Sequence, residues 1–243
     1  MKLSRLKNSQ AKATVIFDGD DTLWETQSLY EVAKEEFFRE MAKLGFRPDK
    51  VRERFETIDH ANVKKRGFSK SRFPRSMAET YRAFCVDNRV AIDNSIARRA
   101  RYIGGKVFRA SPRILDEVVD TLSELRARKI RLLLATKGER DVQERRVEQS
   151  GLRYLFDRVF IFGHKGREEF EHILLEEDID ASKGWSVGNS IKSDINPALT
   201  VGLNAIWIPQ NTWAYEEERP IVSSRLYKVQ SIRQITEIIL GST

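Results

Sequence analysis

Cysteine and histidine are scarce in this sequence of 243 residues, which holds one cysteine and three histidines. The single Cys85 excludes an intramolecular disulfide and a cluster of thiolate metal ligands. The histidines (His60, His164 and His172) are too scattered to suggest a structural zinc site. We therefore expect a protein of a reducing compartment and predict the cytoplasm as its location.

Long apolar runs are also missing, because no stretch approaches the roughly 18 to 20 residues that a membrane-spanning helix needs. The first 13 residues, MKLSRLKNSQAKA, carry positive charge without an apolar segment after it, so we interpret them as a leader and not as a secretory signal. Hydrophobic residues make up 40% of the chain and charged residues 33%. This composition is typical of a soluble globular protein, and the length suits one α/β domain with an insert.

Positive charge is in excess, with 43 Lys and Arg against 36 Asp and Glu and a formal net charge of +7. Residues 24–105 hold 18 of the cations against 12 anions, and within them residues 60–82 hold seven against one. Such a run is ordinarily a solvated helix face, whereas its functional interpretation is a surface for nucleic acid or an acidic substrate. Gly67, Phe68 and Pro74 interrupt the run, which favours a shaped loop.

Hydrophobic periodicity predicts two kinds of segment. Residues 13–17 have the pattern of a buried strand, and residues 28–45 that of an amphipathic helix in which Ser28 and Glu31 have the spacing of a capping box. Further helices are predicted over about 50–60, 75–87 and 91–103, with no further strand before about 130. Strands and helices then alternate. The predicted strands are 130–136, 158–162, 184–188, 204–209 and 225–229. The predicted helices are 113–128, one that ends at Gly151, 167–177, 191–201 and 231–240.

The later strands are continuous apolar runs, which are typical of strands covered on both faces and therefore of a parallel sheet. We predict an α/β protein whose doubly wound parallel sheet is built from residues 1–24 and 106–243. An all-helical domain, residues 25–105, is inserted after the first strand.

Polar residues follow four strands of the predicted sheet, at the edge where ligands bind in open parallel sheets. They are Asp18-Gly19-Asp20-Asp21-Thr22, Thr136-Lys137-Gly138, His164-Lys165-Gly166 and Gly188-Asn189-Ser190 with Asp194. Each group also has an ordinary explanation as a turn or as the first turn of a helix. Carboxylates gathered at one edge repel one another unless a cation compensates them, and oxygen ligands of this kind suit Mg²⁺. A lysine there would balance that charge and the charge of a bound phosphate.

The order of these groups resembles that of the haloacid dehalogenase-like hydrolase superfamily, in which D-x-D-x-[TV] is followed by Thr or Ser, then Lys, then G-[DN]-x-x-x-x-D. The resemblance covers the whole chain, including a helical cap inserted after the first motif. The segments FDGDDTLW, TKG, VGNSIKSDINPA and GFSKSRFPRSMAET are similar to one bacterial branch of the superfamily. Asp21 departs from the commoner Gly of the first motif, and Asn189 from the commoner first Asp of the fourth.

The resemblance implies a phosphatase that works through an aspartyl-phosphate. Asp18 would be the nucleophile and Asp20 the general acid and base, which true haloacid dehalogenases lack. Mg²⁺ would be held by Asp18 and Asp194, by the Asp20 carbonyl and, directly or through water, by Asn189, which removes one negative ligand from the motif. The phosphate group would be bound by Asp18, Gly19, Thr136, Lys137 and Lys165.

We therefore predict a Mg²⁺-dependent phosphomonoester hydrolase acting on a small phosphorylated metabolite. A phosphotransferase or mutase would use the same intermediate. A non-catalytic protein would keep the fold and bind nucleic acid or an acidic partner through its basic cap, but it would not need this set of Asp and Lys, so we do not expect nucleic acid as a partner. In the cap, we expect Lys70, with Arg66 or Arg72, to recognise anionic groups of the substrate, the alternative being solvated charges on the outer face. The sequence makes no prediction of the oligomeric state.

Overall fold

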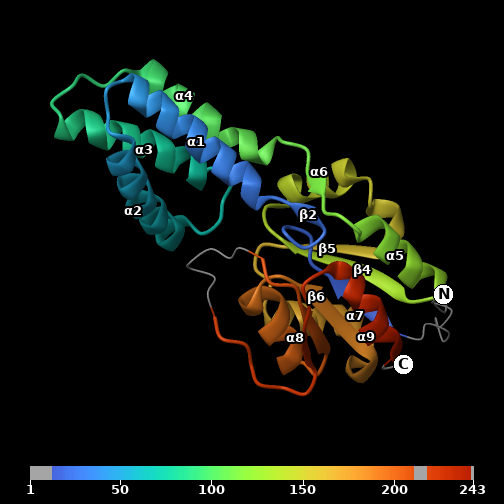
Figure 1. Cartoon of the computed structure of the whole chain (residues 1–243). Coiled ribbons are helices and arrows are strands. Elements are labelled where there is room, and N and C mark those ends of the chain that lie inside the picture. Colours follow the sequence, from blue (N-terminus) through green and yellow to red (C-terminus); the bar gives the residue numbers. More distant parts are fainter. Residues whose placement is uncertain (1–12, 211–217, 242–243) are drawn as a thin grey trace, which may run out of the picture. The chain divides into compact units, whose positions relative to one another are not determined.

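The computed structural model describes residues 13–210 and 218–241. Most of the predicted leader, residues 1–12, lies outside the described residues. The chain divides into two compact units, which Figure 1 shows in colours that follow the sequence. We call residues up to Glu25 and from Arg113 onward the core unit, and Thr26–Pro112 the cap unit.

Within the described residues, six strands of the core unit form one parallel sheet in the order β5-β4-β1-β6-β7-β8. Strand β1 lies between β4 and β6, and its Thr14 pairs with Arg131 on one side and Gly184 on the other. The predicted α/β fold is confirmed. The strands are β1 (Thr14–Phe17), β4 (Arg131–Lys137), β5 (Arg158–Phe162), β6 (Gly184–Gly188), β7 (Asn204–Trp207) and β8 (Leu226–Lys228).

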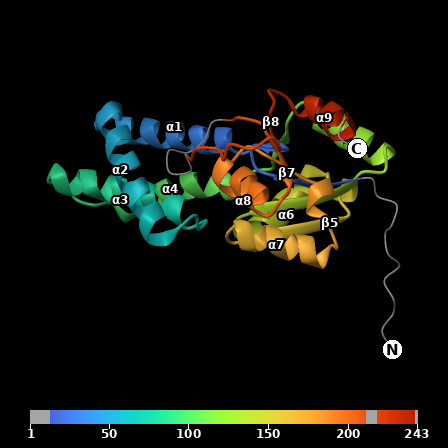
Figure 2. The same ribbon diagram turned by 90° about the horizontal axis from the view of Figure 1, so that it is seen from below.

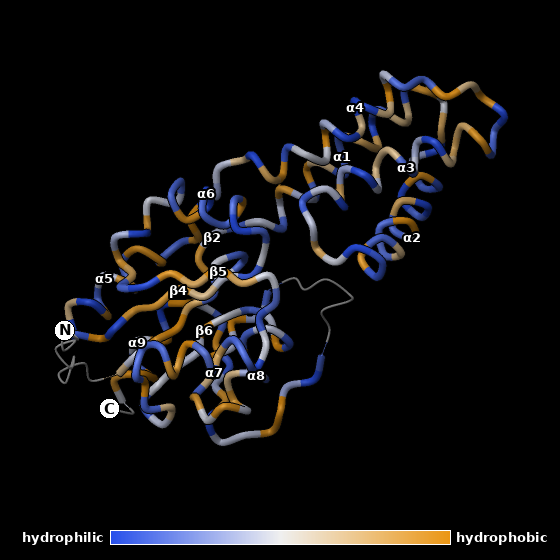
Figure 3. Tube along the Cα trace, turned by 180° about the vertical axis from the view of Figure 1, so that it is seen from behind, coloured by the Kyte–Doolittle hydropathy of each residue, from blue (hydrophilic) through white to orange (hydrophobic). Residues whose placement is uncertain are grey.

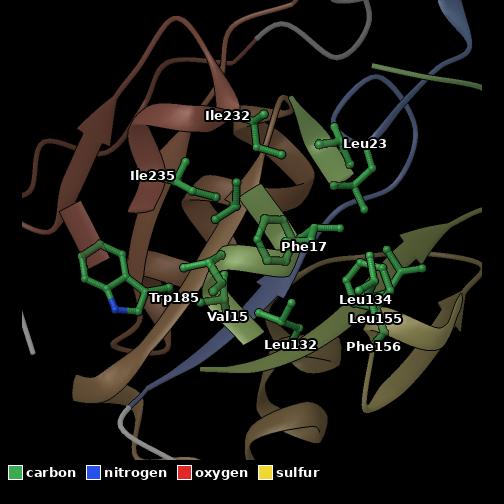
Figure 4. Packing of buried hydrophobic residues seen from close by; sticks show 14 of the residues in the cluster. Val15, Phe17, Leu23, Leu132, Leu134, Leu155, Phe156, Trp185, Ile232 and Ile235 are labelled. Atoms are coloured by element: carbon green, nitrogen blue, oxygen red, sulfur yellow. The ribbon is translucent and has the colours of Figure 1, made fainter. Parts of the chain in front are cut away.

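Helices cover both faces of this sheet because successive side chains of each strand point to opposite sides. On one face, Val15 and Phe17 pack in a cluster that includes residues of α5 (Val118–Ala127), α6 (Arg140–Ser150) and α9 (Ile235–Gly241). On the other, Ile16 packs against residues of α7 (Arg167–Glu176) and α8 (Asn196–Thr200). Figure 2 shows the arrangement from below, and Figure 4 shows strand side chains meeting Ile232 and Ile235 in the larger cluster. The polar strand ends are thereby mounted on a closely packed three-layer core.

The cap unit is built from four helices: α1 (Gln27–Lys43), α2 (Pro48–Arg66), α3 (Arg72–Asp87) and α4 (Asn94–Gly105). Its own core gathers aromatic rings, among them Phe37, Phe55 and Phe73, with centroids 6.1 Å and 5.7 Å apart in successive pairs. Orange and blue segments alternate along these helices in Figure 3, as expected for helices that bury one face. Val107, in a short 3₁₀ turn after α4, is buried in the same cluster, which explains why the cap unit extends to Pro112.

Two local predictions were wrong. Helix α1 begins at Gln27, so Ser28 lies within its first turn and is not the N-cap of a capping box. The carboxylate of Glu31 instead accepts hydrogen bonds from Gln27 and Lys34, at 3.0 and 2.8 Å.

The second error concerns the start of α5, which we expected at residue 113. Strand β3 (Arg113–Ile114) precedes it and pairs antiparallel with β2 (Trp24–Glu25). The Arg113 guanidinium also donates to the Glu25 carboxylate at 2.7 Å. Strands of two residues have no detectable periodicity, so the sequence pattern did not reveal them. The prediction that no further strand occurs before residue 130 therefore fails at this pair.

No helix in the described part of the chain is both long and apolar enough to cross a membrane.

Candidate active site

Three of the four predicted strand ends meet at the side chain of Lys165. This lysine lies between β5 and α7. The first turn of α7 is closed by a hydrogen bond from the Gly166 N–H to the Glu169 carboxylate, at 2.8 Å. The Lys165 ammonium contacts Asp18, at the end of β1, and lies 2.6 Å from Oδ1 of Asp194. It also donates to the carbonyl of Ala135 at 2.8 Å. All three ionisable side chains are buried, so their charges interact in a poorly solvated environment.

Burial and the negative charge of Asp194 raise the pKa of Asp18 to about 7, against the opposing effect of Lys165. Burial alone would lower the pKa of Lys165, but the two carboxylates outweigh it and raise the pKa above its ordinary value. One lysine thus balances two buried carboxylates only in part. Additional positive charge beside Asp18 would favour the ionised form of Asp18.

The loop after β6 holds Asp194 through several hydrogen bonds. Asp194 Oδ2 accepts from the backbone N–H of Ser190 at 2.8 Å, and the Asp194 carbonyl accepts from the Ser186 hydroxyl at 2.9 Å. A Cβ added at Gly188 would lie only 2.3 Å from Asp194 Oδ2. The glycine predicted in this motif therefore leaves room for the carboxylate.

Thr136 and Gly19 lie side by side at the same edge. Thr136 is fully buried, and its Oγ1 has no hydrogen-bond partner among the described residues. An added Cβ at Gly19 would lie 3.3 Å from this oxygen and 2.5 Å from the Trp24 ring. A buried hydroxyl without a partner is costly, and a phosphate oxygen would satisfy it. The neighbouring Lys137 donates to the Ser193 hydroxyl at 2.9 Å.

The donor set at these strand ends fits a hard divalent cation such as Mg²⁺, which prefers oxygen ligands. In residues 13–210 and 218–241, no three His, Cys, Asp or Glu side chains gather as a metal-binding group. A cation would therefore rely on the carboxylates of Asp18 and Asp194, supplemented by amide and backbone oxygens. Thr22 links the side chains of Asp18 and Asn189, with its hydroxyl 3.3 Å from Asp18 Oδ2 and 3.4 Å from Asn189 Oδ1.

Donors contact both carboxylate oxygens of Asp20. Oδ1 accepts from the Trp24 indole at 2.7 Å, and Oδ2 accepts from Gln143 at 3.0 Å and from Arg146. Gln143 and Arg146 were not identified from the sequence. Their spacing of three residues places them on one face of α6, and the structure shows that this face is buried.

Asp21 has a φ of 58°, a left-handed conformation that glycine adopts without steric cost and that Asp tolerates better than most residues. The commoner Gly at this position of the motif is explained by this backbone geometry.

The predicted cap residues have different environments. Arg66, at the end of α2, and Lys70, in the loop before α3, are exposed. Arg72 is only 2% exposed, and its guanidinium pairs with the buried Asp59 inside the cap unit. This contact occupies Arg72 in the packing of α2 against α3.

A family model described as haloacid dehalogenase-like hydrolase matches residues 12–202, most of the chain. The chain belongs to the haloacid dehalogenase-like hydrolase family. The matched residues include all four strand ends of the candidate site.

Curated proteins and a solved structure are also similar to this chain. N-acylneuraminate-9-phosphatase of Mus musculus is 28% identical over 134 residues, which are 52% of this chain and 52% of that protein. Glyceraldehyde 3-phosphate phosphatase of Methanocaldococcus jannaschii is 24% identical over 93% of this chain and 96% of that protein. The crystal structure of a haloacid dehalogenase-like family hydrolase from Xanthomonas campestris has a TM-score of 0.76 and 24% identity, covering 96% of both chains. The chain spans about half the length of the N-acylneuraminate-9-phosphatase that it matches.

Proposed function

We propose that the protein is a Mg²⁺-dependent phosphatase that hydrolyses a small phosphorylated metabolite through an aspartyl-phosphate on Asp18. The observation that carries the proposal is the buried contact of Lys165 with both Asp18 and Asp194, beside the unsatisfied hydroxyl of Thr136. Two relatives whose names denote phosphatases of small phosphorylated molecules support the same chemistry.

In the first step, a carboxylate oxygen of Asp18 attacks the phosphorus atom, and the bond from phosphorus to the ester oxygen breaks. The carboxyl group of Asp20 gives its proton to that leaving oxygen, so an alcohol departs and the phosphoryl group remains on Asp18. Lys165 and Thr136 hold the transferring oxygens, the first by charge and the second by its hydroxyl. Gly19 keeps the backbone after Asp18 close to the same group.

In the second step, a water molecule attacks the phosphorus atom and passes a proton to Asp20. The bond from phosphorus to Asp18 breaks, inorganic phosphate leaves, and both carboxyl groups return to their initial protonation states. A second carboxyl close in sequence to the nucleophile is needed for both transfers. A halide needs no proton on departure, so Asp20 favours phosphate esters over haloacids as substrates.

Asp18 and Asp194 would hold Mg²⁺ by their carboxylates, Asp20 by its carbonyl and Asn189 by its amide oxygen or through water. When bound, the cation offsets the clustered negative charge and stabilises charge on the transferring phosphoryl group. Asp18 must be ionised to attack phosphorus, and its pKa is raised to about 7. A cation beside it would favour the ionised form, which supports a metal at this site.

We further propose that the exposed cations of the cap unit contribute to the choice of substrate. Arg66 and Lys70 belong to residues 60–82, where seven Lys and Arg stand against one acidic residue. Exposed basic groups at this density favour anionic small molecules. We predicted Arg72 as a member of the same group, but its guanidinium pairs with the buried Asp59. Arg72 would therefore stabilise the packing of the cap unit and not bind substrate.

A screen of phosphate release tests the proposal directly. The purified protein is assayed against a panel of small phosphate esters that includes N-acylneuraminate 9-phosphate and glyceraldehyde 3-phosphate, with Mg²⁺ and with EDTA. We expect release from at least one ester in Mg²⁺ and a loss of at least about 100-fold in EDTA. Asp18→Asn is the matched negative control. Release that persists in Asp18→Asn would overturn the assignment of the nucleophile, and transfer to added alcohols in place of water would indicate a phosphotransferase.

A further inference from the structure

We infer that Arg146, together with Gln143, positions Asp20 for its proton transfers, an inference that rests on the proposed function. The side chains of Gln143 and Arg146, both on α6, donate to the same oxygen of Asp20, Oδ2. The two residues lie outside the motif pattern from which we predicted the site.

The side chains of Arg146 and Gln143 are buried, and that of Asp20 is largely so. The side chain of Arg146 is 6% exposed, and that of Asp20 is 27% exposed. Gln143 is 2% exposed. A guanidinium removed from water at this depth needs a close acceptor, because an unpaired buried charge is strongly destabilising. The contact with Asp20 supplies that acceptor within the core unit.

Three donors around one carboxylate also fix its orientation. Trp24 donates to Oδ1, whereas Gln143 and Arg146 donate to Oδ2, so rotation of the carboxylate would break contacts on both sides. A general acid and base must place its oxygen within hydrogen-bond reach of the leaving group or water. Loss of this orientation costs rate even when substrate binding is unchanged.

Gln143 ties the same carboxylate to the strand end that carries Thr136. Its amide nitrogen donates both to Asp20 Oδ2, at 3.0 Å, and to the backbone carbonyl of Lys137, at 2.9 Å. A Cβ added at Gly138 would lie 2.7 Å from this nitrogen, so the glycine leaves the space that Gln143 occupies. One side chain of α6 therefore connects the ends of β1 and β4.

The inference predicts that Arg146 acts through Asp20 and matters most where a leaving group needs a proton. In Arg146→Met, we expect kcat/KM for an alkyl phosphate to fall by about 10- to 100-fold, mainly through kcat, with KM changed by less than about threefold. For 2,4-dinitrophenyl phosphate, whose leaving group departs without a proton, kcat/KM should fall by less than about threefold, because kcat/KM reports only the steps up to the aspartyl-phosphate. Arg146→Lys, which keeps the charge, should restore part of the lost rate.

A double-mutant cycle separates this role from a structural one. In the background of Asp20→Asn, Arg146→Met should change the remaining kcat by less than about twofold, because its target is already lost. Arg131→Met serves as the matched control, since Arg131 forms a half-buried pair with Glu177 at the start of β4, the opposite end of the strand from the site. It should lower the thermal stability and leave both rates unchanged.

The possible results are distinguishable. A wild-type protein that hydrolyses no phosphate ester would overturn the proposed function and this inference with it. An active wild type in which Arg146→Met lowers kcat/KM equally for both substrates, or in which the two substitutions have additive effects, would overturn this inference alone.

Discussion

The ammonium of Lys165 lies 2.6 Å from Oδ1 of Asp194, although the two residues follow strands that are separated in the sheet by β4 and β1. Lys165 therefore reaches across the ends of both intervening strands and meets Asp18 on the way. One buried cation holds together the ends of strands that contribute separately to the site.

Removal of that cation is the first prediction. Lys165→Met should lower kcat/KM for phosphate esters by at least about 100-fold, because it leaves the transferring group without its balancing charge. The same substitution leaves Asp18 and Asp194 facing each other, so its melting temperature should be lower at pH 8 than at pH 5. Thermal unfolding at the two pH values checks this. A variant equally stable at both would contradict the charge balance described for these residues.

Asp18→Asn should abolish hydrolysis and, in the metal-free protein, raise stability at alkaline pH. The pKa of Asp18 is raised to about 7 in the folded state from 3.8, so the folded protein binds the proton more tightly than the unfolded chain. The favourable contribution is present below pH 3.8 and is lost as the pH rises through 7. The gain from the neutral Asn should therefore grow between pH 5 and pH 8, as measured by urea unfolding in EDTA. An unchanged difference across this range would show that Asp18 does not titrate as described.

Asn189→Asp should lower the Mg²⁺ concentration needed for half-maximal activity. The substitution restores a negative ligand at the position where the family more commonly has Asp, and Asn189 already lies within 3.4 Å of Thr22, which contacts Asp18. We expect a decrease of about 10-fold, measured by titration of the EDTA-treated protein. Asn204→Asp, an amide-to-acid change at the start of β7, is a matched control that should leave the titration unchanged.

Arg72→Met should destabilise the cap unit. It leaves the buried carboxylate of Asp59 without its cation, a change that costs about 3 to 5 kcal/mol in comparable pairs. Urea unfolding measures the loss. The double variant Asp59→Leu/Arg72→Met should recover part of it, whereas an exposed arginine of the cap unit such as Arg54 should tolerate the same replacement within about 0.5 kcal/mol.

Lys70→Glu should leave the cap unit folded and change how substrates bind. Because Lys70 is exposed, its reversal should raise KM for the preferred anionic ester several-fold with little change in kcat. Lys50→Glu, on the exposed surface of α2, is the charge-matched control. Equal kinetics for Lys70→Glu and the control would assign Lys70 to the solvated surface.

The order of strand-end motifs was visible in the sequence because parallel strands bring their carboxyl ends to one edge. Asp18, Lys165 and Asp194 are accordingly in contact. The burial of Arg72 was not visible, since one basic residue among others gives no sign that it will pair with Asp59, the residue just before the run, inside the cap unit. Gln143 and Arg146 escaped notice for a similar reason: α6 is polar along most of its length, and only the fold shows which polar face is buried.

The insertion of the cap unit determines the order in which parts of the protein can assemble. Strand β1 pairs with β4, with Thr14 opposite Arg131. The whole cap unit, Thr26–Pro112, lies in the chain between these two strands. The cap unit is continuous in sequence and buries its own cluster, so it forms from contacts closer along the chain. During synthesis, its helices are complete before β4 has emerged, while β1 still lacks both neighbours. The residues that meet at Lys165 come together only after β6 and its loop have left the ribosome, which makes the reactive edge one of the last parts of the nascent chain to form.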